Sequence, residues 1–236
     1  MQALLAIIEK ELRTYFASPI AYVVTAAFLA LTGLLFVQIV GLVRQADLRP
    51  LFSNIAIVFV LLGPVLTMRL LAEEARSGAI ELLLTAPVRD ATIIAGKFLA
   101  GLLMLVAMLV PTLYYPLLLG LFSTPDWGPV AAGYLGVLLL GSACLALGLF
   151  TSSLTENQIV AAVLGIGLLL TLWVVGGAAD LFGGPAGALV RQLELPAHFF
   201  DFPRGVIDSR HVVFFASVTA AGLFLSYLAL QSRRWR

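Results

Sequence analysis

The sequence carries very little charge for its length. Of its 236 residues, 11% are Asp, Glu, Lys or Arg and 61% are hydrophobic, whereas soluble domains are typically about 25% charged and about 45–50% apolar. Such a chain cannot cover its surface with polar side chains, so we expect lipid to solvate it. The formal net charge of +1 argues against the large basic surface of a nucleic-acid-binding protein.

Cysteine and histidine are also scarce. The single cysteine, Cys144, lies in a hydrophobic run, so a disulfide framework is excluded and we interpret Cys144 as a small buried apolar residue. His198 and His211 lie outside the hydrophobic runs or at the edge of one. An isolated histidine in such a place is more often a solvated surface group than a metal ligand. The N-terminal segment does not resemble a cleaved signal peptide, because its charged residues follow its apolar ones.

The motifs of an enzyme are missing. The chain contains no Gly-x-Ser-x-Gly, no His-Glu-x-x-His and no paired Asp within its hydrophobic runs. We therefore predict no catalytic residue, no bound cofactor and no metal site. Gly96-Lys97 looks like the end of a phosphate-binding loop, but that loop needs Gly at Ala91 and Ser or Thr at Phe98. Any use of ATP must take place in another chain.

Long hydrophobic runs are what the sequence has in abundance. A helix needs about 20 apolar residues to cross the ~30 Å hydrocarbon core of a bilayer. Because open sheet edges are not tolerated in lipid, we predict helices and an all-α integral membrane protein, with residues 1–236 forming one transmembrane domain. The six predicted spans are residues 20–43, 51–68, 98–122, 130–150, 159–179 and 212–230.

Prolines and small residues mark particular places in these spans. Pro64 in the second span and Pro111 and Pro116 in the third each remove a backbone donor and are expected to kink the helix. Ala161 and Gly165 form a small-x-x-x-small pair, at which the fifth span could approach another helix closely. With the N-terminus inside, most Lys and Arg residues fall on the inner side, so we expect both termini in the cytoplasm.

An amphipathic segment precedes the first span. Over residues 2–18, apolar residues recur at helical spacing and fill one arc. Ser18-Pro19 then breaks the helix. We predict an interfacial helix that lies on the cytoplasmic face of the membrane and turns into the first span; the alternative is a helical extension of that span. The arc contains Leu4, Leu5, Ile8, Leu12, Tyr15 and Phe16, with Ile7 as the exception.

Residues 69–97, between the second and third spans, are rich in charge. Arg69 and Glu73 are four residues apart, which suits an ion pair along a helix. Gly78 is expected to end that helix, and Pro87 to end a further short one. Such a segment could be a rigid contact for a cytoplasmic partner, or it could be a solvated amphipathic loop, and composition alone favours neither. Its charged residues are Arg69, Glu73, Glu74, Arg76, Glu81, Arg89, Asp90 and Lys97.

The same segment resembles a family signature. Residues 72–88, followed by Gly96-Lys97-Phe98, are similar to the cytoplasmic signature of ABC-2 type ABC transporter permeases. In that family the pattern Glu-x-x-x-Gly-x-x-Glu-x-Leu-Leu-x-x-Pro, then Gly-Lys, lies between spans two and three and includes the coupling helix that touches the ATPase. Residues 10–22 and 198–210 resemble the gliding-motility-associated branch of these permeases.

The resemblance implies the permease subunit of an ATP-driven exporter in the bacterial cytoplasmic membrane. Residues 2–18 would be its elbow helix, and residues 180–210 its outward loop. A dimer of separate ABC ATPase subunits would bind ATP and Mg²⁺, and the permease would pair with a second copy or a sister chain. The family also admits an auxiliary membrane subunit with an external domain. The ATPase-coupling contact is carried onto Glu73, Glu74, Arg76, Gly78 and Glu81.

Other interpretations stay open at this point. A non-transporting subunit that couples ATP hydrolysis to an envelope or gliding-type machine would keep the same fold and partner. An ion-coupled carrier would need no ATPase, but its spans usually contain ionisable residues, and these do not. Phe199, Phe200 and Phe202 either sit at the lipid headgroups or pack over the outer ends of the helices. The sequence does not identify the substrate.

Overall fold

The protein is built almost entirely from helices. The computed structural model describes residues 2–43, 47–81, 88–123, 125–179 and 184–233, and none of these forms a strand. Six helical segments are long and apolar enough to cross a membrane, which confirms the expected all-α fold with six spans. These segments are Pro19–Gly41, Arg49–Ser77, Asp90–Phe122, Trp127–Leu154, Gln158–Ala178 and Ser209–Arg233.

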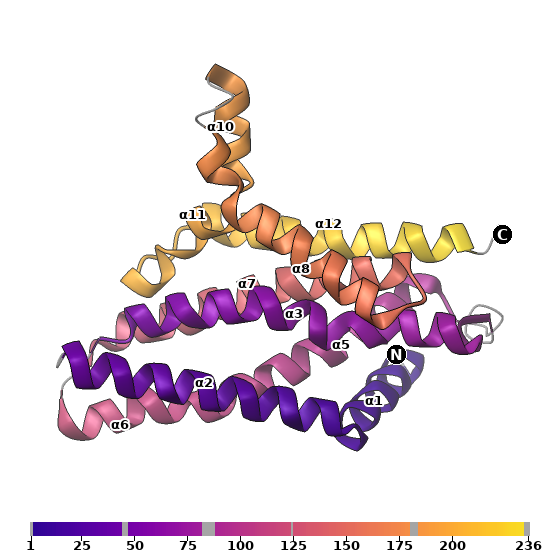
Figure 1. Cartoon of the computed structure of the whole chain (residues 1–236). Coiled ribbons are helices and arrows are strands. Elements are labelled where there is room, and N and C mark those ends of the chain that lie inside the picture. Colours follow the sequence, from indigo (N-terminus) through magenta and orange to yellow (C-terminus); the bar gives the residue numbers. More distant parts are fainter. Residues whose placement is uncertain (1, 44–46, 82–87, 124, 180–183, 234–236) are drawn as a thin grey trace.

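The spanning helices lie alongside one another as an elongated bundle (Figure 1). Helix α1 lies at the end of the bundle where α3 ends and α5 begins, and α12 also finishes at that end (Figure 1). Helix α10 projects away from the bundle, near α11 (Figure 1). The bounds are α1 Gln2–Ala17, α2 Pro19–Val43, α3 Arg49–Ser77, α5 Asp90–Leu109, η1 Val110–Leu113, α6 Tyr114–Phe122, α7 Trp127–Leu154, α8 Gln158–Val174, η2 Val175–Ala178, α10 Gly184–Gln192, α11 Leu195–Phe199, η3 Phe202–Arg204 and α12 Ser209–Arg233.

Helix α7 is the centre of the bundle and packs against α3, α5, α8 and α12. In the most apolar window of each span, 56% to 67% of the residues of α3, α5–α6 and α7 are buried, against 17% to 22% for α2, α8 and α12. The inner helices therefore supply the core, which includes Cys144 as predicted. The outer helices expose large apolar side chains, a surface that suits hydrocarbon and not water.

Glycines set how closely the inner helices approach. A Cβ atom on Gly148 of α7 would lie 3.0 Å from the Cα of Pro64, and one on Gly165 of α8 would lie 2.7 Å from the Cβ of Pro64. The predicted close approach at Ala161 and Gly165 is therefore confirmed, and α3 is the helix approached. On the far side of α7, Gly222 of α12 faces the Ala146 backbone directly.

The prolines act in different ways. The third span breaks at Pro111, where the 3₁₀ turn η1 separates α5 from α6, as its missing backbone donor predicts. Helix α3 continues through Pro64, and Pro116 lies in the first turn of α6, where a helix tolerates proline. Gly78, in a left-handed conformation with φ of 72°, ends α3 as expected.

The segment between the fifth and sixth spans folds into α10, α11 and η3. Phe199 and Phe202 are fully buried, and the Cβ of Phe202 lies against Gly136 of α7, where an added Cβ would come within 2.6 Å of it. Of the two interpretations offered by the sequence, packing over the ends of the helices is therefore correct for these two residues. Phe200 is 40% exposed. Helices α11 and η3 together form a cap on one end of α7.

Candidate coupling site

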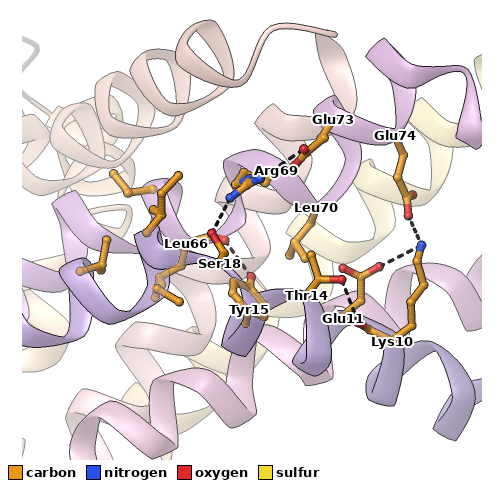
Figure 2. Close-up of a pocket in the computed structure, with 14 residues that line it drawn as sticks. Lys10, Glu11, Thr14, Tyr15, Ser18, Leu66, Arg69, Leu70, Glu73 and Glu74 are labelled. Atoms are coloured by element: carbon orange, nitrogen blue, oxygen red, sulfur yellow. Dashed lines mark hydrogen bonds and ion pairs between the residues drawn. The ribbon is translucent and has the colours of Figure 1, made fainter.

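A cluster of four charged side chains, three of them largely buried and one, Lys10, exposed, joins three helices at the opposite end of the bundle. Lys97 of α5 places its Nζ 2.7 Å from Oε1 of Glu11 on α1 and 2.8 Å from Oε2 of Glu74 on α3. Lys97 is only 1% exposed, and its Nζ also donates to the Leu70 carbonyl at 2.6 Å. Lys10 of α1 donates to Oε1 of Glu74 at 2.6 Å (Figure 2). We call Lys10, Glu11, Glu74 and Lys97 the ion cluster.

The ion cluster is balanced in charge, with two cations and two carboxylates. Buried charges are tolerated in a fold only when they are paired, because each loses its hydration. The Lys97–Glu74 contact is an ion pair by distance but is not aligned as a hydrogen bond, whereas the Lys97–Glu11 contact is a hydrogen bond as well. Burial of Lys10 disfavours its charge, but the contacts with Glu74 and Glu11 outweigh this and raise the pKa of Lys10. Lys10 therefore stays charged at neutral pH.

The neighbour of Lys97 explains why α1 can approach so closely. A Cβ atom on Gly96 would lie 2.7 Å from Cγ2 of Ile7, so only glycine fits between α5 and α1. Ile7, the exception to the predicted apolar arc, thus faces the protein. Leu5 and Phe16, which belong to that arc, are 61% and 51% exposed. Helix α1 consequently has two apolar sides, one packed on α5 and one facing away from the bundle.

The corner between α1 and α2 is fastened to α3 by a second group of contacts (Figure 2). Tyr15 donates from its hydroxyl to the Leu66 carbonyl at 2.7 Å. Arg69 donates from Nη1 to the Ser18 hydroxyl at 2.8 Å and from Nε to Glu73 Oε2 at 2.8 Å. Burial raises the pKa of Tyr15, so its hydroxyl remains a donor. These residues border a cavity of about 180 Å³ that charged, polar and apolar side chains line together.

Helix α7 holds the same part of α3 from the other side. The hydroxyl of Ser152, which is fully buried, donates to the Met68 carbonyl at 2.9 Å. It accepts from the backbone N–H groups of Leu71 at 3.2 Å and Ala72 at 3.1 Å. All hydrogen-bonding capacity of this hydroxyl is used within the protein. The end of α3 is therefore bound to α1, α5 and α7 as one rigid unit.

An open polar hollow of about 950 Å³ lies beside this rigid unit. Its walls are the last turn of α3 with the residues after it, the turn between α7 and α8, and the end of α12. Arg233 spans the hollow's edge, donating from Nε to the Ser153 carbonyl at 3.2 Å, with Nη1 3.7 Å from Glu156. The lining residues are Ala75, Arg76, Ile80, Glu81, Ser153, Leu154, Thr155, Glu156, Asn157, Ala229, Ser232 and Arg233. We call this surface the terminal hollow.

Comparison with known families finds a match over most of the chain. The family described as ABC-2 family transporter protein matches residues 2–193, most of the chain. The chain belongs to the ABC-2 transporter family. Among curated proteins, no sequence matches it. ABC-2 proteins are the membrane components of transporters and associate with an ABC ATPase, so this ABC-2 permease is a multi-pass membrane protein and not the catalytic subunit.

Two of the residues predicted for the ATPase contact of this ABC-2 permease form ion pairs within the protein. Glu74 is held in the ion cluster, and its side chain is 12% exposed. Glu73 forms an ion pair with Arg69 and is 43% exposed. Their carboxylates therefore hold the end of α3 in place within the permease. The sequence predicted the Arg69–Glu73 ion pair but not the contacts of Glu74 with Lys10 and Lys97.

The other predicted contact residues lie at the terminal hollow of the permease or beside it. Arg76 and Glu81 are exposed and line the hollow, and Gly78 lies between them at the end of α3. A second helical piece starts after Gly78, as predicted. The rest of the predicted coupling helix, residues 82–87 with Pro87, lies outside the described residues. The turn between α7 and α8 and the end of α12 also line this surface. The sequence did not predict that they take part in it.

Proposed function

We propose that this ABC-2 protein is the permease subunit of an ATP-driven exporter in the bacterial cytoplasmic membrane, and that an ATPase subunit docks in the terminal hollow. The observation that carries the proposal is the hollow itself: a concave, polar surface directly beside a rigid joint of spanning helices. Its residues Arg76, Glu81, Glu156 and Arg233 supply both signs of charge for a partner. Docked surfaces of this kind gain specificity from charge complementarity.

Force applied at the hollow would pass into the membrane through α3. Helix α3 is continuous from Arg49 to Ser77, so its charged end and its spanning part are one element. Because the ion cluster ties α3 to α1 and α5, a movement imposed by the ATPase would shift these helices together. In this mechanism ATP and Mg²⁺ bind to a dimer of partner ATPase subunits, and α1 acts as the elbow helix on the cytoplasmic face.

The arrangement of the chain ends supports this orientation. Helix α1 lies toward the same end of the bundle as the ends of α3 and α12 (Figure 1), and residues at those two ends line the terminal hollow. An ATPase bound there is cytoplasmic, so both termini would be cytoplasmic and the segment with α10 and α11 would be external. A second permease copy or a sister chain would complete the transport pathway, and an auxiliary external subunit would dock at the other end. The gliding-motility branch is not supported, because the family that matches is described only as ABC-2 family transporter protein.

Arg76→Glu is expected to weaken ATPase docking at least tenfold. Reversing one charge in the terminal hollow places like charges together in the complex, and a tenfold change in affinity corresponds to about 1.4 kcal/mol. The measurement is the amount of ATP-hydrolysing subunit that co-purifies with the tagged permease from its native membrane in mild detergent. Arg13→Glu is the matched control, because Arg13 is an exposed arginine of α1 outside the hollow.

Two results would contradict the proposal. One is that no ATP-hydrolysing protein co-purifies with the wild-type permease. The other is that Arg76→Glu and Arg13→Glu retain equal amounts of it. Reconstitution of the complex in liposomes then separates an exporter from a non-transporting subunit, because only the exporter's ATPase rate rises when its substrate is added.

A further inference from the structure

The two histidines are not isolated surface groups, which corrects the expectation from the sequence. His211 Nε2 lies 3.0 Å from Oδ2 of Asp201, and His211 Nδ1 lies 2.9 Å from Nδ1 of His198. His198 Nε2 lies 3.1 Å from the Gln192 carbonyl oxygen. All four ring nitrogens therefore lie in one continuous chain that links α10, α11 and the start of α12. We call Asp201, His211, His198 and the Gln192 carbonyl the histidine chain.

The two ends of the histidine chain fix the number of protons that it holds. A carboxylate and a carbonyl oxygen only accept hydrogen bonds, so Nε2 of His211 and Nε2 of His198 must both carry hydrogen. Between the two Nδ1 atoms, one nitrogen must donate and the other accept. The complete chain thus needs three N–H groups on two rings. Two neutral histidines supply only two, so one ring must be an imidazolium, whose charge the Asp201 carboxylate balances.

The surroundings of the two rings differ. His198 stacks on Phe214 with ring centroids 3.8 Å apart, and burial lowers the pKa of His198, with His211 and Arg210 acting in the same direction. Glu194 and the bond to the Gln192 carbonyl oppose this but do not reverse it. The Asp201 carboxylate lies 3.0 Å from His211, so an imidazolium at His211 would be directly balanced by a negative charge.

Few other charged groups surround the histidine chain. Helices α7 and α8, which pack against α11, contain no Asp, Glu, Lys, Arg or His. Arg204 places Nη1 3.3 Å from Oδ1 of Asp201 and so helps to keep this carboxylate ionised. The charged residues on the packed elements and beside them are Arg49, Asp126, Arg191, Glu194, Arg204, Asp208 and Arg210. Because α7 and α8 supply no Asp, Glu, Lys, Arg or His, the proton held within the histidine chain dominates the response of this chain to pH.

We propose that the histidine chain is a one-proton lock, which fastens α11 to the start of α12 only while the two rings share a single extra proton. When the contacts of the histidine chain are broken, the unfastened pair of rings, His198 and His211, holds two protons more than two neutral rings well below about pH 6.5. Well above that pH it holds none more. Above this pH the unfastened pair binds fewer protons than the lock, so the lock weakens as pH rises. Below it the unfastened pair binds more, so the lock weakens as pH falls.

The lock acts on the cap over α7. Phe199 of α11 and Phe202 of η3 are the fully buried side chains with which the cap packs on the bundle. In sequence, His198 precedes Phe199 and Asp201 precedes Phe202. Fastening these residues to α12 holds the cap closed, so the cap is most tightly held near pH 6.5 and loosens on both sides. This device does not depend on the ATPase or on the terminal hollow.

The proton count can be measured on the wild-type protein. The chain has only two histidines, so histidine labelled with ¹⁵N gives ring signals from His198 and His211 alone. In lipid nanodiscs we expect three protonated ring nitrogens and one unprotonated one over a plateau centred at about pH 6.5, with a titration step on each side. A single step centred near pH 6.5 for both rings, with no plateau, overturns the proposal.

Amide hydrogen exchange of residues 195–204, corrected for its intrinsic pH dependence, reports the lock itself. Wild-type protection should be greatest near pH 6.5 and fall by severalfold one to two pH units away on either side. In His198→Gln the chain is broken, so the maximum should disappear while protection of α7 is kept. A maximum that survives in His198→Gln, or protection in the wild type that does not vary with pH, contradicts the lock.

Discussion

Lys97→Met is expected to destabilise the protein by about 3–5 kcal/mol, the cost of breaking a buried ion pair by removing one partner. Methionine fills much the same volume but leaves Glu11 and Glu74 to share one cation of the ion cluster, Lys10, whose Nζ lies 3.7 Å and 2.6 Å from them. The Leu70 carbonyl also loses its donor from Nζ. Most of this cost is the penalty of an uncompensated carboxylate, so it should be relieved when that carboxylate is neutralised.

The measurement is thermal unfolding of the purified chain in one detergent, with two comparison variants. Lys97→Met/Glu11→Gln leaves Lys10 and Glu74 as a balanced pair, so it should recover most of the loss in melting temperature. Arg13→Met removes a cation from an exposed pair with Glu9, in which the side chains are 80% and 63% exposed, and should change little. A double variant less stable than Lys97→Met would show that the ion cluster does not work as described.

The six spans could be predicted from the sequence because lipid imposes a simple requirement. A run such as residues 130–150 must be helical if it is apolar and long enough to cross the bilayer, whichever helix it packs against. The end of α3 at Gly78 was predictable for a similar reason, since a left-handed residue favours glycine at a helix terminus. These features depend on local chemistry and on the solvent, not on the tertiary arrangement.

The ion cluster was not predicted, because it depends on which helices meet. Glu11 lies on the buried side of α1, four residues after Ile7 and four before Tyr15, and an acidic residue there was a signal that it needs a buried cation. Gly96 beside Lys97 was a second signal, since it lets another helix approach the lysine. Only the packing of α1 on α5 identifies Lys97 as the partner of Glu11. The histidines are similar: they are separated in sequence, and folding of the segment before α12 brings them together.

Gly222→Val is expected to lower the melting temperature strongly, by an amount equivalent to about 1–3 kcal/mol or more. A Cβ atom at this position would lie 2.9 Å from the carbonyl carbon of Ala146 and 3.1 Å from its carbonyl oxygen. These atoms belong to the main chain of α7, the most buried span, and cannot rotate away as a long side chain could. Helix α12 would therefore have to move away from α7 along its length.

Gly167→Val provides the matched control for this change, since it makes the same substitution within α8 where no atom lies within 4 Å of the added Cβ. Both variants exchange glycine for the same β-branched residue in a spanning helix, so the difference between their melting temperatures isolates the contact with α7. Gly222→Val should melt well below Gly167→Val in the same detergent. Equal melting temperatures would mean that α12 is not held against the α7 backbone, and the central position of α7 in the bundle would then be wrong.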